Sequence, residues 1–281
     1  MPKRIYALAA ARFLGAGLLA SLLVSCTTVP ETGRRGLMLI TPEQELQLGI
    51  SEFRKLKQST PICTDAKTNE MVQRVGRRIS AVAPLANARW EFVVFDDNKT
   101  VNAFCLPGGK VGIYTGIMRI TQDEAGLATV IGHEVSHAVA RHGAERLSQG
   151  LLAEFGGEIL GQVINTNSED TRELWLQVYG LAGAVGVLLP YSRLQESEAD
   201  YLGLLYMARA GYDPRQAIEF WKRMAAHGSK QGGNFLAGVF QFLSTHPLDE
   251  ARIKQLQEQL PKALAEYQPA IANEPTGGES P

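Results

Sequence analysis

Two histidines spaced four residues apart constrain this chain more than any other feature of its sequence. His133 and His137 frame the motif HEVSH inside a segment of helical periodicity. Residues four apart on an α-helix lie one turn apart on the same face, so both imidazoles can bind one metal ion. Glu134 projects beside them, where a carboxylate can take a proton from a metal-bound water. The motif predicts one zinc ion per chain. The alternative is a histidine-bearing helix without metal.

The sequence also offers a third ligand, which a catalytic zinc requires in addition to one open position. In the motif ESEAD, Glu196 and Asp200 stand four residues apart and share one helical face. We expect Glu196 to bind the metal. We expect Asp200 to accept a hydrogen bond from a ligand histidine, which would fix the tautomer and orientation of that ring. The alternative for these acids is an ordinary charged helix face.

Helical geometry argues against two other candidate ligands. His142 follows His137 by five residues, so on a continuous helix it points roughly 140° away and is expected to face elsewhere. Glu198 projects away from both other carboxylates of ESEAD. We expect it to be a solvated partner of Arg193 or Lys222.

Five segments, taken in order, resemble the zinc metallopeptidases that include the CAAX prenyl protease, HtpX-type and mitochondrial Oma-type proteases, and YggG (LoiP)- and BepA-like lipoproteins. They are TGRRGLMLIT (32–41), VNAFCLPGGKVGIYTGIM (101–118), IGHEVSHAVARH (131–142), ESEAD (196–200) and STHPLDEARI (244–253). The resemblance is closest to the soluble, lipoprotein-like members. It implies a gluzincin fold with zinc on His133, His137 and Glu196, and Glu134 as general base.

Periodicity and turn residues predict an α+β, mainly α-helical domain over residues 41–266. The resemblance implies that this domain is zincin-like, with a small β-sheet whose edge strand flanks the HExxH helix. We expect a capping box of Thr121 with Glu124, and a type II turn at Pro107 and Gly108. The expected strands are 90–95, 102–106 and 110–115, and the expected helices are 41–57, 68–82, 121–142, 145–164, 171–189, 192–210, 214–226 and 249–260.

The resemblance further implies that the strand at 110–115 is a sheet edge that binds substrate as an added strand. An open edge pairs with the backbone of an extended peptide whatever its side chains, which suits unfolded substrates. The alternative is a purely structural hairpin. The candidate substrate-binding residues are Asn102, Lys110, Val111, Gly112, Ile113 and Tyr114.

The resemblance also places His246 at the cleft, with Arg252 six residues later within reach of it. Two roles for His246 stay open. It can donate a hydrogen bond to the oxyanion of the tetrahedral intermediate, or it can occupy the open zinc position as a reversible plug.

The N-terminus reads as an export signal. Basic residues precede an apolar run at 13–24 that is too short to span a bilayer, and LVSC at 23–26 resembles the bacterial lipobox. We expect a signal peptide at 1–25, a lipidated Cys26 and a tether at 26–40. The alternatives are a plain signal peptide or an uncleaved anchor. Thr27, where Asp would favour inner-membrane retention, predicts an outer-membrane anchor facing the periplasm of a Gram-negative cell.

The net charge of −1 argues against nucleic acid as a partner, because the chain has no excess of basic residues to attract the phosphate backbone. The even count of cysteines left after lipidation suggests a possible disulfide between Cys63 and Cys105, with two buried thiols as the alternative. Leu174–Leu189 is uncharged but too short to span a membrane, and is expected to be a buried helix or a wall of the cleft. Residues 267–281 are expected to form a disordered tail.

These features together predict a lipid-anchored periplasmic zinc endopeptidase acting on misfolded or misassembled envelope proteins. The membrane, through Cys26, and the outer-membrane assembly machinery are its expected partners. The quality-control role rests on the resemblance alone. The alternative is a zinc-containing chaperone or assembly factor for outer-membrane proteins, with little proteolysis. Glu134 argues for the enzyme, because a structural zinc site has no use for a base beside its ligands.

Overall fold

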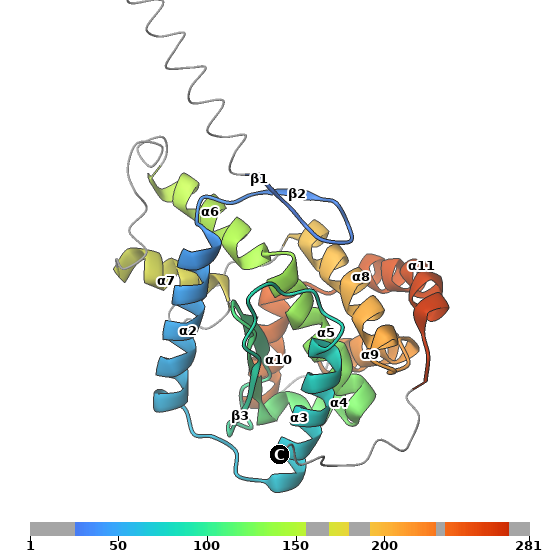
Figure 1. Ribbon diagram of the computed structural model, residues 1–281. Helices are drawn as coiled ribbons and strands as arrows, with labels where there is room; N and C mark the ends of the chain where they lie inside the picture. Colours follow the sequence, from blue (N-terminus) through green and yellow to red (C-terminus); the bar gives the residue numbers. More distant parts are fainter. Residues whose placement is uncertain (1–25, 156–168, 180–191, 229–233, 270–281) are drawn as a thin grey trace, which may run out of the picture.

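The computed structural model describes residues 26–155, 169–179, 192–228 and 234–269, in which a small sheet lies between two groups of helices (Figure 1). The sheet contains β3 (Glu91–Phe95), β4 (Ala103–Leu106) and β5 (Lys110–Tyr114). A separate hairpin pairs β1 (Cys26–Thr28) with β2 (Arg35–Leu37). The helices are α2 (Pro42–Ser59), α3 (Ala66–Ser80), α4 (Met118–Thr121), α5 (Glu124–Val139), α6 (His142–Phe155), α7 (Glu169–Val178), α8 (Arg193–Arg209), α9 (Arg215–Gly228), α10 (Asn234–Thr245) and α11 (Glu250–Glu266). This is the mainly helical α+β architecture that the sequence predicts.

The strand order is β3-β5-β4, so β5 is the central strand. Gly112 of β5 has Val93 of β3 beside it in parallel pairing and Phe104 of β4 beside it in antiparallel pairing. The prediction that residues 110–115 form the sheet edge is therefore wrong. Within the described residues, the strand with one neighbour that packs on α5 is β4. The two arms of a hairpin are interchangeable in sequence terms, and the distant β3 decides which arm becomes internal.

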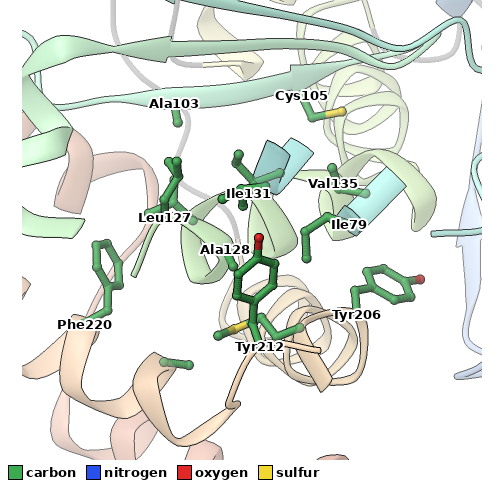
Figure 2. Packing of buried hydrophobic residues seen from close by; sticks show 14 of the residues in the cluster. Ile79, Ala103, Cys105, Leu127, Ala128, Ile131, Val135, Tyr206, Tyr212 and Phe220 are labelled. Atoms are coloured by element: carbon green, nitrogen blue, oxygen red, sulfur yellow. The ribbon is translucent and has the colours of Figure 1, made fainter. Parts of the chain in front are cut away.

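Both faces of the sheet are buried. Side chains alternate along each strand, so Ala103 and Cys105 of β4 point to one face and Phe104 to the other. Figure 2 shows Ala103 and Cys105 above Ile131 of α5, with α8 on the far side of that helix. On the opposite face Phe104 packs with Phe95 and with side chains of α2, α6 and α7. The HExxH helix is thus held between the sheet and α8.

The helix predicted for residues 121–142 is divided into three. Thr121 ends the short α4, and α5 is capped by Asp123, whose side chain accepts from the Gly126 N–H at 2.8 Å. The expected capping box of Thr121 with Glu124 is therefore wrong. At the other end α5 stops at Val139, Arg141 takes a left-handed φ of 54°, and α6 begins at the next residue. This reversal brings His142 back toward α5.

Helices α5 and α8 cross at two glycines. A Cβ on Gly132 would lie 3.2 Å from the Gly203 carbonyl oxygen, and a Cβ on Gly203 would lie 3.2 Å from the His133 nitrogen. The absence of both side chains lets the two backbones approach closely. The crossing therefore sets the distance between the motifs HEVSH and ESEAD.

The segment at 26–40 is not a free tether. It forms the β1–β2 hairpin and buries Val29, Met38 and Ile40 against the domain. Helix α10 was not predicted, although its sequence is strongly apolar. Gly108 has a φ of 83°, the positive value that the predicted type II turn requires after Pro107, and Gly109, the next residue, is also left-handed with a φ of 75°.

Several predictions fall partly or wholly on residues that the structure does not describe. These are the signal peptide at 1–25, the later parts of the helices at 145–164 and 171–189, and the tail from 270 onward. Where residues are described, α6 and α7 occupy the first parts of those two helices, and Trp175 and Val178 are fully buried. The described part of the chain contains no helix that is both long and apolar enough to span a membrane.

Candidate metal centre

Four side chains meet beside the crossing of α5 and α8. His133 and His137 come from α5, Glu196 from the first turn of α8, and His246 directly follows α10. His133 Nε2 lies 3.1 Å from His137 Nε2 and 3.3 Å from His246 Nδ1. Glu196 Oε1 lies 3.3 Å from His137 Nε2 and 3.1 Å from His246 Nδ1. A tetrahedral zinc with bonds of about 2.0–2.1 Å separates its ligand atoms by about 3.3–3.4 Å, so this donor set fits zinc.

Electrostatics give His137 and Glu196 the protonation states that metal ligands need. Each of the four is at most 3% exposed. Burial holds the pKa of His137 well below its ordinary value and keeps that ring neutral. Burial also raises the pKa of Glu196, but the charges of Arg252 and His246 outweigh this effect and hold the pKa well below its ordinary value. A neutral imidazole and an ionised carboxylate both have lone pairs for a cation.

Glu134 lies next to this group with one oxygen free to act. Its side chain is buried, and its Oε1 makes no hydrogen bond within the described residues. His246 Nε2 lies 3.6 Å from that oxygen. Burial raises the pKa of Glu134, which makes it a stronger base than an exposed carboxylate.

Asp200 supports the first histidine. Its Oδ1 lies 3.0 Å from His133 Nδ1, the contact that the i, i+4 spacing with Glu196 predicts. Arg252 from α11 holds the same carboxylate, with Nε 2.6 Å from Oδ2 and Nη2 2.9 Å from Oδ1, and it also pairs with Glu196. The guanidinium lies 3.9 Å from the centroid of the Trp221 ring. Arg252 of α11 therefore contacts two acids of α8 at the centre, Asp200 and Glu196.

His142 does not face away, as a continuous helix would require. Because α5 ends at Val139 and the chain reverses at Arg141, His142 Nδ1 lies 2.8 Å from His137 Nδ1. Its other nitrogen, Nε2, lies 2.8 Å from Glu198 Oε2. The second ligand histidine is therefore supported through another histidine.

Glu198 is not solvated either. It is 7% exposed and accepts hydrogen bonds from Thr32 and from Arg34 Nε, whereas Arg193 and Lys222 pair with other acids. The expectation of a surface acid is wrong because α8 is buried on nearly all sides, so the side opposite the zinc ligands faces the N-terminal hairpin. The contacts of Thr32 and Arg34 with Glu198 could not be predicted from the spacing within either segment.

Comparisons with known proteins agree with this geometry. The sequence model described as peptidase family M48 matches residues 66–260, more than half of the chain. The chain belongs to peptidase family M48. Zinc is the metal of this family, in keeping with the donor set described above.

The relatives of this chain include mitochondrial and bacterial proteins. The chain is 41% identical over 204 residues to the mitochondrial metalloendopeptidase OMA1 of Schizosaccharomyces pombe, covering 70% of this chain and 54% of that protein. The Saccharomyces cerevisiae OMA1 is 37% identical over 185 residues, covering 66% and 51%. The beta-barrel assembly-enhancing protease of Escherichia coli is 26% identical over 233 residues, covering 82% and 46%. The chain spans about half the length of these curated relatives.

The residues predicted to bind substrate lie in the sheet of the M48 domain, but not at one edge. Val111, Gly112, Ile113 and Tyr114 are buried in the central strand, and Lys110 begins it with Nζ donating to the Arg89 carbonyl at 2.6 Å. A Cβ on Gly112 would lie 2.2 Å from Phe104 Cζ, so this glycine makes room for an aromatic ring. Asn102 alone precedes the outer strand, and its Oδ1 accepts from the Ala103 N–H at 2.9 Å.

Cys63 and Cys105 are both free. Cys63 pairs with the outer side of β3, where its N–H donates to the Val94 carbonyl, whereas Cys105 lies in β4 on the opposite side of β5. Three strand spacings separate them, about 14 Å at 4.8 Å each. A disulfide requires Cα atoms within about 7 Å, so the predicted bridge is excluded by the sheet order.

Proposed function

We propose that this chain is a zinc-dependent endopeptidase that cleaves unfolded or misassembled proteins of the bacterial envelope. The observation that carries the proposal is Glu134, a buried carboxylate with a free oxygen beside the four-donor centre. A centre built only for stability has no use for a base at that position. Peptidase family M48 membership and the names of the relatives support the same activity.

The side chains divide the reaction between them. His133, His137 and Glu196 would hold the ion, which when bound polarises the scissile carbonyl and lowers the pKa of a coordinated water. Glu134 then takes a proton from the attacking water at its free oxygen. The same carboxyl group later delivers that proton to the leaving amine nitrogen.

We infer that His246 plugs the position that a catalytic centre needs to keep open. Its Nδ1 lies among the expected ligands, 3.1 Å from Glu196 Oε1 and 3.3 Å from His133 Nε2. The helix that leads to it also packs against the loop before β4, since a Cβ on Gly238 of α10 would lie 2.3 Å from the Lys99 carbonyl oxygen. Cleavage therefore requires His246 and the end of α10 to move away.

The substrate edge is β4. Tyr114 N–H donates to the Asn102 carbonyl at 3.1 Å, and hydrogen-bonded pairs alternate in an antiparallel ladder. Phe104 is then paired with Gly112 inside the ladder, and the N–H and C=O of Cys105 point to the outer side. An extended peptide would add to that side, next to α5.

A second candidate function is a chaperone with a structural zinc. The specific observation in its favour is the closed set of four donors, because structural zinc sites have four protein ligands. In that case His246 would be a permanent ligand, and its loss would weaken zinc binding without producing any cleavage.

The deciding experiment compares casein digestion and zinc content in the native chain, Glu134→Gln, His246→Ala and the double variant. The proposal expects about one zinc in each, cleavage that rises in His246→Ala, and a loss of about 10²–10⁴-fold when Glu134→Gln is added. Absence of cleavage in His246→Ala, with zinc lost, would favour the chaperone. A loss of cleavage in His246→Ala with zinc retained would assign His246 to the oxyanion instead.

The substrate edge is tested by a proline placed at Cys105. Cys105→Pro removes an outward N–H and no ladder hydrogen bond, so zinc content should persist while cleavage of unfolded protein falls at least about tenfold. Cys105→Ala keeps the N–H and is the matched control for the lost thiol. Phe104→Pro removes an internal hydrogen bond and should destabilise the sheet. Equal activity of Cys105→Pro and Cys105→Ala would reject β4 as the binding edge.

The proposed location is the outer membrane, with a lipid on Cys26 and the catalytic domain facing the periplasm. The apolar run at 13–24 and the LVSC motif at 23–26 support this location. The relatives named for beta-barrel assembly suggest the outer-membrane assembly machinery as a partner. Incorporation of labelled palmitate into the native chain but not into Cys26→Ala tests the anchor. A labelled Cys26→Ala chain would contradict it.

A further inference from the structure

The two nitrogens of the His137 ring have different surroundings. Nε2 faces the other donors, 3.1 Å from His133 Nε2 and 3.3 Å from Glu196 Oε1. Nδ1 faces the opposite way, 2.8 Å from His142 Nδ1. A neutral imidazole that offers Nε2 to a metal carries its proton on Nδ1. His137 must then donate this hydrogen bond, and His142 must accept it.

The direction of this hydrogen bond also determines how His142 and Glu198 interact. With its Nδ1 accepting, a neutral His142 carries its proton on Nε2, which donates to Glu198 Oε2 at 2.8 Å. His142 is fully buried and Glu198 is 7% exposed, so water has little access to either contact. The orientation of His137 is thereby tied to the position of the Glu198 carboxylate.

The Glu198 carboxylate is itself held by the turn between β1 and β2. Thr32 Oγ1 donates to Oε1, and Arg34 Nε lies 2.5 Å from Oε2. The two terminal nitrogens of Arg34 bind the Glu145 carboxylate of α6 at 2.9 and 3.0 Å. The planar fork of one guanidinium therefore joins α6 to α8.

We infer that the N-terminal hairpin is part of the metal centre, and that Arg34 is a positioning residue acting on His137 through Glu198 and His142. The chain of contacts Arg34–Glu198–His142–His137 is here called the hairpin relay. It extends the carboxylate–histidine–metal arrangement by one imidazole and ends in a segment more than 100 residues before the ligand. Docking of the hairpin would then tune zinc affinity. The inference rests on His137 being a zinc ligand, as the proposed function holds.

The chain offers a matched control for Arg34. Arg209 also holds the hairpin turn, through Glu31 at 2.9 Å, and it pairs with Glu266 of α11. It is 31% exposed and contacts no member of the hairpin relay in the interactions described above. Arg209→Gln therefore loosens the same hairpin without changing the contacts of His142 or Glu198.

The experiment is a double-mutant cycle read out as zinc affinity, by chelator competition on the full chain. His142→Phe should weaken zinc binding by about 10–100-fold, the range for losing the partner of a ligand histidine, and Arg34→Gln by about three- to tenfold. In the His142→Phe background, Arg34→Gln should cause no further loss. Arg209→Gln should change the affinity less than about twofold in either background. If His142→Phe does not fold, Glu198→Gln provides the second background.

A second readout separates positioning from stability. The visible absorption of the cobalt-substituted protein reports ligand geometry, so it should change in His142→Phe and Arg34→Gln but not in Arg209→Gln. Equal losses from Arg34→Gln in both backgrounds, or equal effects of Arg34→Gln and Arg209→Gln, would overturn the hairpin relay. A native chain that binds no zinc would overturn the metal centre as well, whereas normal binding with unchanged variants would overturn the relay alone.

Discussion

The two histidines of α5 are supported over very different distances along the chain. His133 contacts Asp200, which stands on the same helix as the ligand Glu196 and one turn away from it. His137 depends on the hairpin relay, whose members come from α6, α8 and the turn between β1 and β2. The first support is complete once α5 and α8 have crossed, whereas the second is complete only when the N-terminal hairpin has docked.

This difference separates a fixed part of the centre from an adjustable one. The Asp200 carboxylate is fully enclosed and is bound at both oxygens by Arg252. The Glu198 carboxylate sits at the contact between the domain and the segment that follows Cys26. Events at the N-terminus can therefore reach His137, while His133 stays in place.

Removing the local support should have the largest effect. Asp200→Asn preserves the shape but removes a buried charge that faces His133 and Arg252, so we expect a loss of about 3–5 kcal/mol in unfolding free energy. Zinc affinity should also fall about 10–100-fold. Urea unfolding and chelator competition measure the two quantities. Asp213→Asn breaks an exposed pair with Arg215 and serves as the control, with a loss below about 1 kcal/mol. A variant as mild as this control would show that Asp200 is not the fixed support.

A change at the helix crossing should affect both supports, because α8 carries Asp200 as well as Glu198. Gly203→Ala places a Cβ 3.2 Å from the His133 backbone nitrogen, where neither backbone can yield easily. We expect a loss of about 1–3 kcal/mol together with weaker zinc binding. Gly49→Ala is the control for overpacking away from the ligands. Its Cβ would lie 2.6 Å from the Pro107 carbonyl oxygen, so it should cost more stability than Gly203→Ala while leaving zinc affinity unchanged. Equal zinc affinity in the two variants would separate the crossing from the metal centre.

The two supports also differ in how far they could be predicted from the sequence, because one is local and the other depends on distant segments. Glu134, Glu196 and Asp200 follow from positions within single helices, where a spacing of four residues fixes a shared face. The support of His137 depends on a left-handed residue at Arg141, an uncommon conformation for a side chain that is not glycine. No local sequence pattern predicts a helix end of this kind. The role of Glu198 depends on which distant segment covers the second face of α8.

The sheet shows the same limit. The three strands were predicted close to their observed bounds, because apolar runs and turn residues are local signals. Their order was not, because the parallel pairing of β3 with β5 joins segments separated by the whole of β4. Gly112 is a signal that favours the internal position, since its missing side chain makes room for Phe104. The sheet order also shows that residues 110–114 are not a sheet edge, and it excludes the disulfide.

The smallest change tests how the relay is held at its far end. Thr32→Val removes the donor to Glu198 Oε1 and leaves Arg34 and His142 on Oε2. We expect a loss of about 1.5 kcal/mol in unfolding free energy, the lower end of the usual range for one hydrogen bond to a charged group, and a loss of zinc affinity below about threefold. Thr32→Ser retains the hydroxyl and should restore both quantities. If Thr32→Val weakened zinc binding as strongly as Arg34→Gln, both oxygens of Glu198 would have to be held for His142 to keep its place. The adjustable support would then respond to any loosening of the turn, and Arg34 would lose its special position in the relay.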